Sequence, residues 1–184
     1  MPAYSLGEYR FAGEQVSSFS EIAFTSHKRE NVLITGVNFY TDDFNEEKLQ
    51  SPFLRNENYE TAGGFANYTF ELGKKVAIES GLRADYVFGE KLFVLPRASA
   101  LFKWTTKLTT RIGGGMGYRT PSIFNQEAEL LGYRNVMGIN YDKTVSEESY
   151  GGNADIGFKT GIGDNLFISF NQMFFYSRLQ SPLI

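Results

Sequence analysis

Residues 74–88, KKVAIESGLRADYVF, alternate between apolar and polar side chains along their whole length. From Val76 onward one parity is interrupted only at Ser80 and otherwise holds Val76, Ile78, Leu82, Ala84, Tyr86 and Phe88. The charged residues of the other parity are Lys75, Glu79, Arg83 and Asp85. A period of two predicts a β-strand with one apolar and one polar face, longer than the strands of ordinary globular domains.

The same alternation recurs along most of the chain. Clear examples are residues 98–104, 108–119 and 150–159, whereas residues 166–177 are less regular. Earlier segments fit more loosely, and they are residues 14–27, 32–43 and 59–72. The sequence therefore predicts about eight long strands joined as antiparallel hairpins.

The predicted connections alternate between short and long. Short ones lie near residues 28–30, 73–74, 105–106 and 161–165, a moderate one at residues 89–91, and long ones at residues 43–58 and 119–147. Transmembrane β-barrels have this layout, with short periplasmic turns on one rim and long extracellular loops on the other. The predicted fold class is therefore all-β, an antiparallel transmembrane β-barrel segment. A soluble β-sandwich with a wet polar face is an alternative.

The two faces fit a barrel in outer-membrane lipid, with apolar residues facing lipid and polar residues facing the lumen. The predicted lumen-facing residues are Glu79, Arg83, Asp85, Arg97, Arg111, Asn153 and Asp155. Aromatic residues near strand ends predict interfacial girdles, and they are Tyr86, Phe88, Trp104, Tyr118, Tyr150 and Tyr176.

The composition argues against several functional classes. The 184 residues carry a net charge of −3 with no basic stripe, so a nucleic-acid partner is not expected. The sequence has no cysteine and one histidine, which excludes disulfides, thiolate metal sites and a multi-histidine site. We expect no cofactor and no enzymatic activity. The acidic pairs at residues 42–43 and 46–47 are expected to be solvated loop charges rather than a Ca²⁺ site, since no EF-hand spacing is present.

Residues 108–122, LTTRIGGGMGYRTPS, resemble a signature of TonB-dependent outer-membrane receptors, in which a barrel strand ends in Gly-Tyr/Phe-Arg-Ala-Pro-Ser before an extracellular loop. Thr120 replaces the commoner alanine. Residues 96–104 and 148–157 are similar to the strands on either side, so the resemblance runs from about residue 58 to the end.

This resemblance implies a piece of a plugged barrel of about 22 strands. Residues 1–184 are expected to be one partial barrel domain truncated at both ends, since the plug, the TonB-contacting box, a secretory signal and a terminal aromatic residue are absent. The implied function is uptake of a scarce nutrient, such as a ferric siderophore or cobalamin, across the bacterial outer membrane. TonB and the plug would be partners only in the full-length protein.

The long loop at residues 119–147 is the candidate site for an extracellular small-molecule ligand, because Tyr, Arg and Asn suit recognition loops. The candidate residues are Arg119, Asn125, Gln126, Tyr133, Arg134 and Tyr141. Two alternatives stay open: the loop only covers the barrel mouth, or Arg119 only pairs with a carboxylate such as Glu127. Residues 122–131 are expected to include a short helix.

A second hypothesis for the whole chain is a self-contained small barrel with a structural or adhesive role, since eight strands can close alone.

Overall fold

A computed structural model describes residues 10–47, 55–133, 136–139, 144–163 and 166–180, without the side chains of Gln126 and Glu127. It forms one eight-stranded antiparallel sheet in which the spatial order of the strands is their order in the sequence. The strands are β1 (Gly13–Lys28), β2 (Asn31–Glu46), β3 (Glu57–Leu72), β4 (Val76–Val87), β5 (Leu92–Lys103), β6 (Leu108–Arg119), β7 (Glu147–Ile162) and β8 (Leu166–Gln180).

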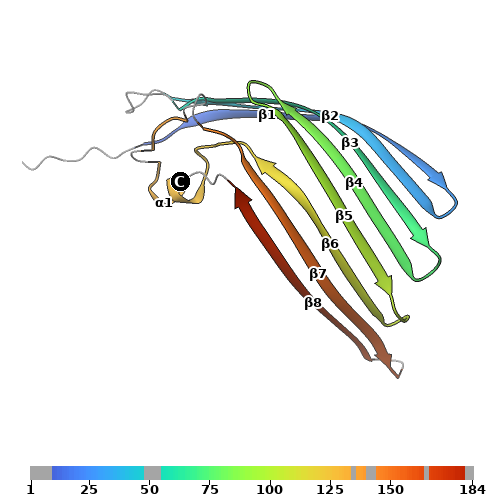
Figure 1. The fold of residues 1–184 in the computed structure, drawn as a ribbon. Coiled ribbons are helices and arrows are strands. Elements are labelled where there is room, and N and C mark those ends of the chain that lie inside the picture. Colours follow the sequence, from blue (N-terminus) through green and yellow to red (C-terminus); the bar gives the residue numbers. More distant parts are fainter. Residues whose placement is uncertain (1–9, 48–54, 134–135, 140–143, 164–165, 181–184) are drawn as a thin grey trace, which may run out of the picture.

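The sheet is strongly curved, and the helix α1 (Gln126–Leu130), in the connection between β6 and β7, lies on its concave side (Figure 1). β1 pairs only with β2, and β8 only with β7, so the described strands form an open wall with two free edges. All eight predicted strands are confirmed, including the three loosely patterned ones. Among the described residues, no helix is long and apolar enough to cross a membrane.

The convex face is the apolar face predicted from the alternation. Its large residues are exposed in this chain, for example Ile22 at 76%, Val37 at 59% and Leu82 at 52%. Five of the six predicted girdle aromatics are also exposed, and they are Tyr86, Phe88, Trp104, Tyr150 and Tyr176. A continuous exposed apolar face of this size is typical of a surface that meets lipid.

Tyr118 is the exception, and its predicted place on the lipid face is wrong. Its ring stacks on that of buried Phe93 with centroids 4.1 Å apart, on the polar face of the sheet. The reason is local: β5–β6 pairing ends at Arg97 and Gly115, next to Pro96, which has no N–H for the ladder. Alternation counted along β6 therefore no longer predicts which side its last residues take.

The predicted short helix exists but is shorter than expected. α1 covers only Gln126–Leu130. It begins late because the residues before it are engaged elsewhere: Ile123 N–H donates to Glu57, and the side chain of Asn125 caps the helix by accepting from Ala128 N–H at 2.8 Å.

Candidate functional site

The concave face carries the polar residues, and all seven predicted lumen-facing side chains lie on it. The register aligns Asp85 with Gly63, Arg97 with Gly81, and Arg111 with Asp155. Asn153 lies opposite Gly113, and Glu79 lies opposite Ser99. The polar face is therefore continuous from β2 to β7.

Glycines let these polar side chains lie flat against the wall. Asn38, Gly63 and Asp85 form one row across β2, β3 and β4. A Cβ at Gly63 would lie 2.3 Å from Asp85 Oδ1 and 2.6 Å from Asn38 Oδ1. A second row, beyond the row of Phe65 and Arg83, repeats the arrangement, because a Cβ at Gly81 would lie close to Asn67 Oδ1 and 2.8 Å from Arg97 Nε.

A hydrogen-bond network joins the first row to the end of β6. Arg83 Nε donates to Asp85 Oδ2 at 2.7 Å, and its NH2 donates to Asn38 Oδ1 at 3.2 Å. Tyr118 OH donates to the same Asp85 oxygen at 3.2 Å. Asp85 and Asn38 are only 3% and 6% exposed. This network fixes the strand that leads into the long loop.

Asn38 Nδ2 and Asp85 Oδ1 are buried without a hydrogen-bond partner among the described residues. Leaving such atoms unpaired costs free energy, so the row tolerates little further disturbance. The second row has its own ion pair, in which Arg97 NH2 donates to Glu79 Oε1 at 2.8 Å, and both side chains are well exposed.

The long loop is anchored to the loop-side ends of β2 and β3. Glu57 accepts hydrogen bonds from Ile123 N–H at 2.6 Å and Ser122 OH at 2.9 Å. Tyr59 OH donates to the Pro121 carbonyl. Burial raises the pKa of the Glu57 carboxyl, and the two donors partly offset that effect.

A second anchor is the buried ion pair of Glu46 and Arg55. Arg55 Nε donates to Glu46 Oε2 at 2.9 Å, and Arg55 NH1 donates to the Tyr133 carbonyl at 2.6 Å. Hydrogen bonding from Arg55 holds the pKa of Glu46 below its usual value. The expectation that the acidic pair at 46–47 is only solvated charge is therefore wrong for Glu46, because its partner lies across the β2–β3 connection.

Aromatic rings fill the space between these anchors. Tyr133 stacks on Phe11 with centroids 4.3 Å apart, and Phe124 packs edge-on against Phe44 at 4.8 Å. The Arg55 guanidinium lies 4.8 Å from the centre of the Phe11 ring. The first half of the long loop is therefore a packed part of the wall.

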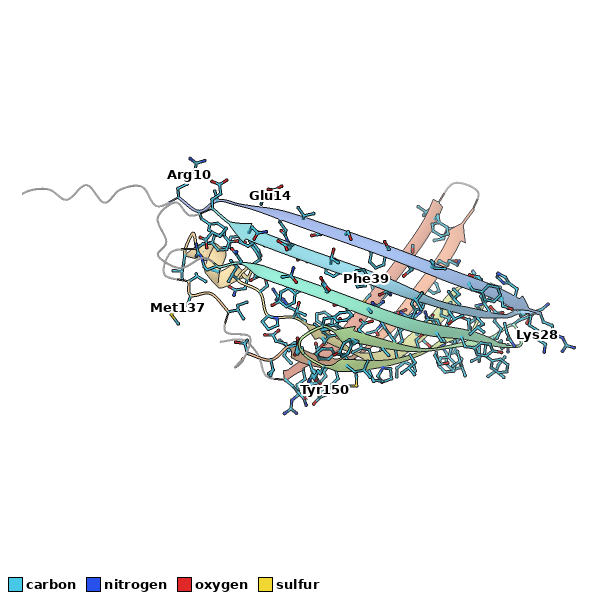
Figure 2. The ribbon with its side chains drawn as sticks, turned by 90° about the horizontal axis from the view of Figure 1, so that it is seen from above. Arg10, Glu14, Lys28, Phe39, Met137 and Tyr150 are labelled. Carbon is cyan, nitrogen blue, oxygen red and sulfur yellow. The ribbon has the colours of Figure 1, made fainter. Side chains whose placement is uncertain are left out.

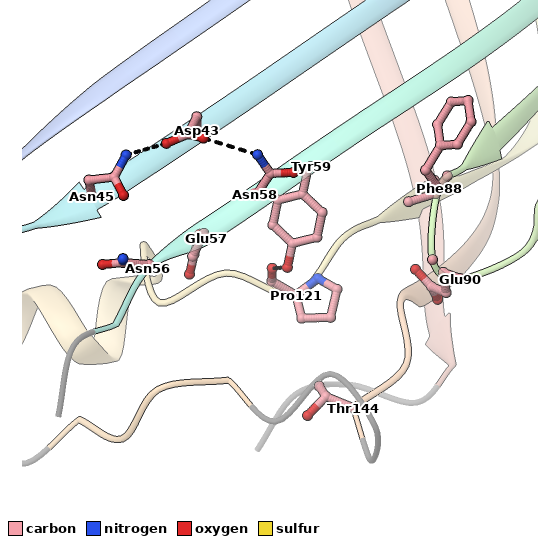
Figure 3. Close-up of a pocket in the computed structure, with 12 residues that line it drawn as sticks. Asp43, Asn45, Asn56, Glu57, Asn58, Tyr59, Phe88, Glu90, Pro121 and Thr144 are labelled. Atoms are coloured by element: carbon pink, nitrogen blue, oxygen red, sulfur yellow. Dashed lines mark hydrogen bonds between the residues drawn. The ribbon is translucent and has the colours of Figure 1, made fainter.

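A pocket of about 480 Å³ lies where the loop crosses the strand ends (Figure 3). It is lined by carboxylates and amides, among them Asp43, Asn45, Asn56, Glu57, Asn58 and Glu90. These carboxylates already have protein donors: Asp43 accepts from Asn45 and Asn58, and Glu90 accepts from Ser146. Among the described residues, no cluster of His, Cys, Asp and Glu is arranged to hold a metal ion.

The candidate ligand residues differ in whether their side chains are engaged in structural contacts. Asn125 caps α1, and Tyr133 is packed in the aromatic cluster, so both have structural contacts. Arg119 is exposed, and its NH2 donates to the Phe124 carbonyl at 3.3 Å. Gln126 contributes backbone to α1, and its side chain lies outside the described residues, as do Arg134 and Tyr141.

The residues that hold the loop were not among the sequence candidates. Arg55 and Glu57 lie in the predicted polar connection at residues 43–58, and Tyr59 is the first residue of the predicted strand at residues 59–72. The available signal was parity, since Glu57 continues the polar face of β3 beyond the predicted strand, on the same side as Tyr59.

No family model and no curated protein matches the sequence. Solved structures do match. The siderophore receptor PirA from Pseudomonas aeruginosa aligns with a TM-score of 0.64 at 17% identity, covering 91% of this chain and 32% of that one. The FrpB iron transporter from Neisseria meningitidis aligns at 0.67 and 14% identity, covering 90% and 28%. This chain has the fold of a segment of the barrel wall of these receptors.

The copper transporter OprC gives a TM-score of 0.62 at 14% identity, covering 82% of this chain and 28% of its own. The chain thus spans less than a third of the length of these receptors and transporters. The matches at this identity describe the fold alone.

Proposed function

We propose that this chain forms part of the barrel wall of an outer-membrane receptor that imports a scarce nutrient as a metal chelate, such as a ferric siderophore. The observation that carries the proposal is the long loop anchored over the polar concave face by Glu57, Tyr59 and Arg55. An anchored loop holds recognition side chains at the barrel mouth at little entropic cost when the ligand binds.

Two further observations support the proposal. The fold is shared with siderophore receptors and with iron and copper transporters. The convex face is apolar and exposed, as a lipid-facing wall requires. We propose binding and transport rather than catalysis, with cobalamin as the second cargo class, and with a plug domain and the partner TonB acting in the full-length protein.

The alternative of a self-contained small barrel has less support, because β1 and β8 are not paired with each other. A free-standing barrel needs that closure to satisfy the backbone groups of both edges in lipid.

Uptake by the source bacterium tests the proposal. Cells lacking the gene should lose accumulation of one radiolabelled metal chelate, and the natural gene on a plasmid should restore it. The restored uptake should stop when the cytoplasmic membrane is de-energised. Unchanged uptake of every ferric chelate and of cobalamin in the deletion strain would reject the proposed role.

A further inference from the structure

The rim formed by the short turns is strongly basic. Lys28 and Arg29 lie at the β1–β2 turn, Lys74 and Lys75 at the β3–β4 turn, and Lys107 at the β5–β6 turn. All five side chains are exposed. We call these five residues the basic rim. The turns that carry them lie along one edge of the sheet (Figure 1), and Lys28 projects at the end of β1 opposite Arg10 and Glu14 (Figure 2).

No side chain of the basic rim makes a hydrogen bond or ion pair within the described part of the chain. Two more cations lie next to them. Lys103 N–H donates to the Lys75 carbonyl at 2.7 Å, and Lys159 N–H donates to the Lys107 carbonyl at 2.8 Å. Glu30 is an exposed carboxylate in the β1–β2 turn, but the five cations of the basic rim outnumber it, and this excess of positive charge favours an external anion.

The opposite rim has the opposite sign. Its described cations are Arg10, Arg55, Lys91, Arg119 and Arg178, and Arg55 and Lys91 are paired with carboxylates. Its described carboxylates are Glu14, Asp42, Asp43, Glu46, Glu47, Glu57, Glu60, Glu90, Glu129, Glu147 and Glu148. The small net charge of −3 therefore hides a separation of charge along the strands.

Aromatic residues place the basic rim relative to lipid. Trp104 is 57% exposed and stacks on Phe102 with centroids 5.7 Å apart, on the convex face near the β5–β6 turn. Tyr68 stacks on Phe70 near the β3–β4 turn. Outward-facing aromatics at strand ends lie at the membrane–water interface, so the basic side chains just beyond them lie at the level of the headgroups.

We infer that the basic rim binds anionic phospholipid headgroups of the leaflet on the short-turn side. The inference rests on the proposed membrane-wall role. The group that these headgroups have in common is a phosphodiester, which lysine and arginine side chains bind through charge-assisted hydrogen bonds. Lipid is favoured over an acidic protein segment because the cations follow the turns in a row beside the aromatic residues, and lysine stems extend readily from such a position to headgroups.

The test compares lipid selectivity in the full-length natural protein, reconstituted in phosphatidylcholine vesicles that contain a trace of spin-labelled lipid. One variant combines Lys28→Gln, Arg29→Gln, Lys74→Gln, Lys75→Gln and Lys107→Gln. A matched control keeps the charge through Lys28→Arg, Lys74→Arg, Lys75→Arg and Lys107→Arg. Spin-labelled phosphatidylglycerol and spin-labelled phosphatidylcholine report which lipid associates with the protein.

The natural protein and the arginine control should associate with phosphatidylglycerol at least about fivefold more strongly than with phosphatidylcholine, because one well-placed basic side chain alone contributes about that factor. The glutamine variant should lose most of that preference, and 0.5 M salt should reduce it in the natural protein. Equal preference in the natural protein and the glutamine variant would overturn the inference, as would no preference in the natural protein.

Insertion is scored separately by the change in gel mobility on heating. A natural protein that inserts but shows no lipid preference loses only this inference. A natural protein that never inserts into vesicles overturns both this inference and the membrane-wall role on which it rests.

Discussion

Asn38 of β2 and Asp85 of β4 meet across Gly63 of β3, the residue that lies between them in the strand register. Both side chains are buried, and each has one polar atom without a partner among the described residues. The missing Cβ of Gly63 is therefore a condition of the Arg83–Asp85–Tyr118 network.

Gly63→Ala should destabilise the folded wall by about 1–3 kcal/mol, because the new methyl group displaces two buried polar side chains. Urea unfolding in vesicles, followed by gel mobility, measures the change. Gly64→Ala is the matched control, since a Cβ there would have only the Gly36 carbonyl within 4 Å, at 3.8 Å. Equal effects of the two substitutions would contradict the role assigned to Gly63.

Glu57→Ala should loosen the long loop without unfolding the wall. The substitution removes the acceptor of Ile123 N–H and Ser122 OH, which weakens loop closure by about 1–3 kcal/mol. Protease cleavage within residues 119–147 should become faster, while the urea midpoint of the strands changes little. Glu60→Ala, at an exposed side chain on the same strand, should leave the cleavage rate unchanged.

Glu46→Gln should destabilise the protein by about 3–5 kcal/mol at neutral pH, because Arg55 stays buried without its ionised partner. Since the pKa of Glu46 is lowered in the folded state, its contribution is present above its unfolded pKa and is lost as pH falls through the folded value. The stability gap between natural protein and variant should therefore narrow below a pH of about 4.

Glu47→Gln is the control for that measurement, because Glu47 is exposed and lies next to Glu46 in the sequence. It should leave stability nearly unchanged at every pH. A gap for Glu46→Gln that stays constant on acidification would show that the ion pair does not stabilise the rim.

Leu82→Arg should impair insertion by about 2–4 kcal/mol if position 82 lies near the middle of the bilayer. Leu82 is on the convex face and 52% exposed. Arg83→Gln on the concave face should impair insertion less, because this face does not meet lipid and the buried Asp85 keeps the Tyr118 hydroxyl as a donor. Refolded yield and unfolding in vesicles give the order, and the reverse order would reject the assignment of faces.

The strands and their faces were predictable because alternation depends on neighbours along the chain, and eight strands followed from it. The failures came where the structure depends on distant partners. Tyr118 turned to the polar face because pairing with β5 stops beside Pro96. Glu46 is buried because Arg55 returns to it after the β2–β3 connection.

The candidate ligand residues show the same limit. Tyr and Asn in a long loop suit recognition, yet Asn125 caps a helix and Tyr133 fills an aromatic cluster. Composition alone does not separate a side chain that binds a ligand from one that holds the loop. The assignment of Arg119 to ligand stays a prediction, and its exposed position at the end of β6 is consistent with it.

Because each strand pairs with the strand next to it in the sequence, the wall has no crossover connections. In the backbone ladder each hairpin is bonded only to its two flanking strands, so duplicating or deleting a hairpin leaves the strand pairing of the others unchanged, whereas the connection between β6 and β7 also contacts β2 and β3 through side chains. A wall of this kind can gain or lose two strands at a time during evolution, and each such step changes the diameter of the barrel.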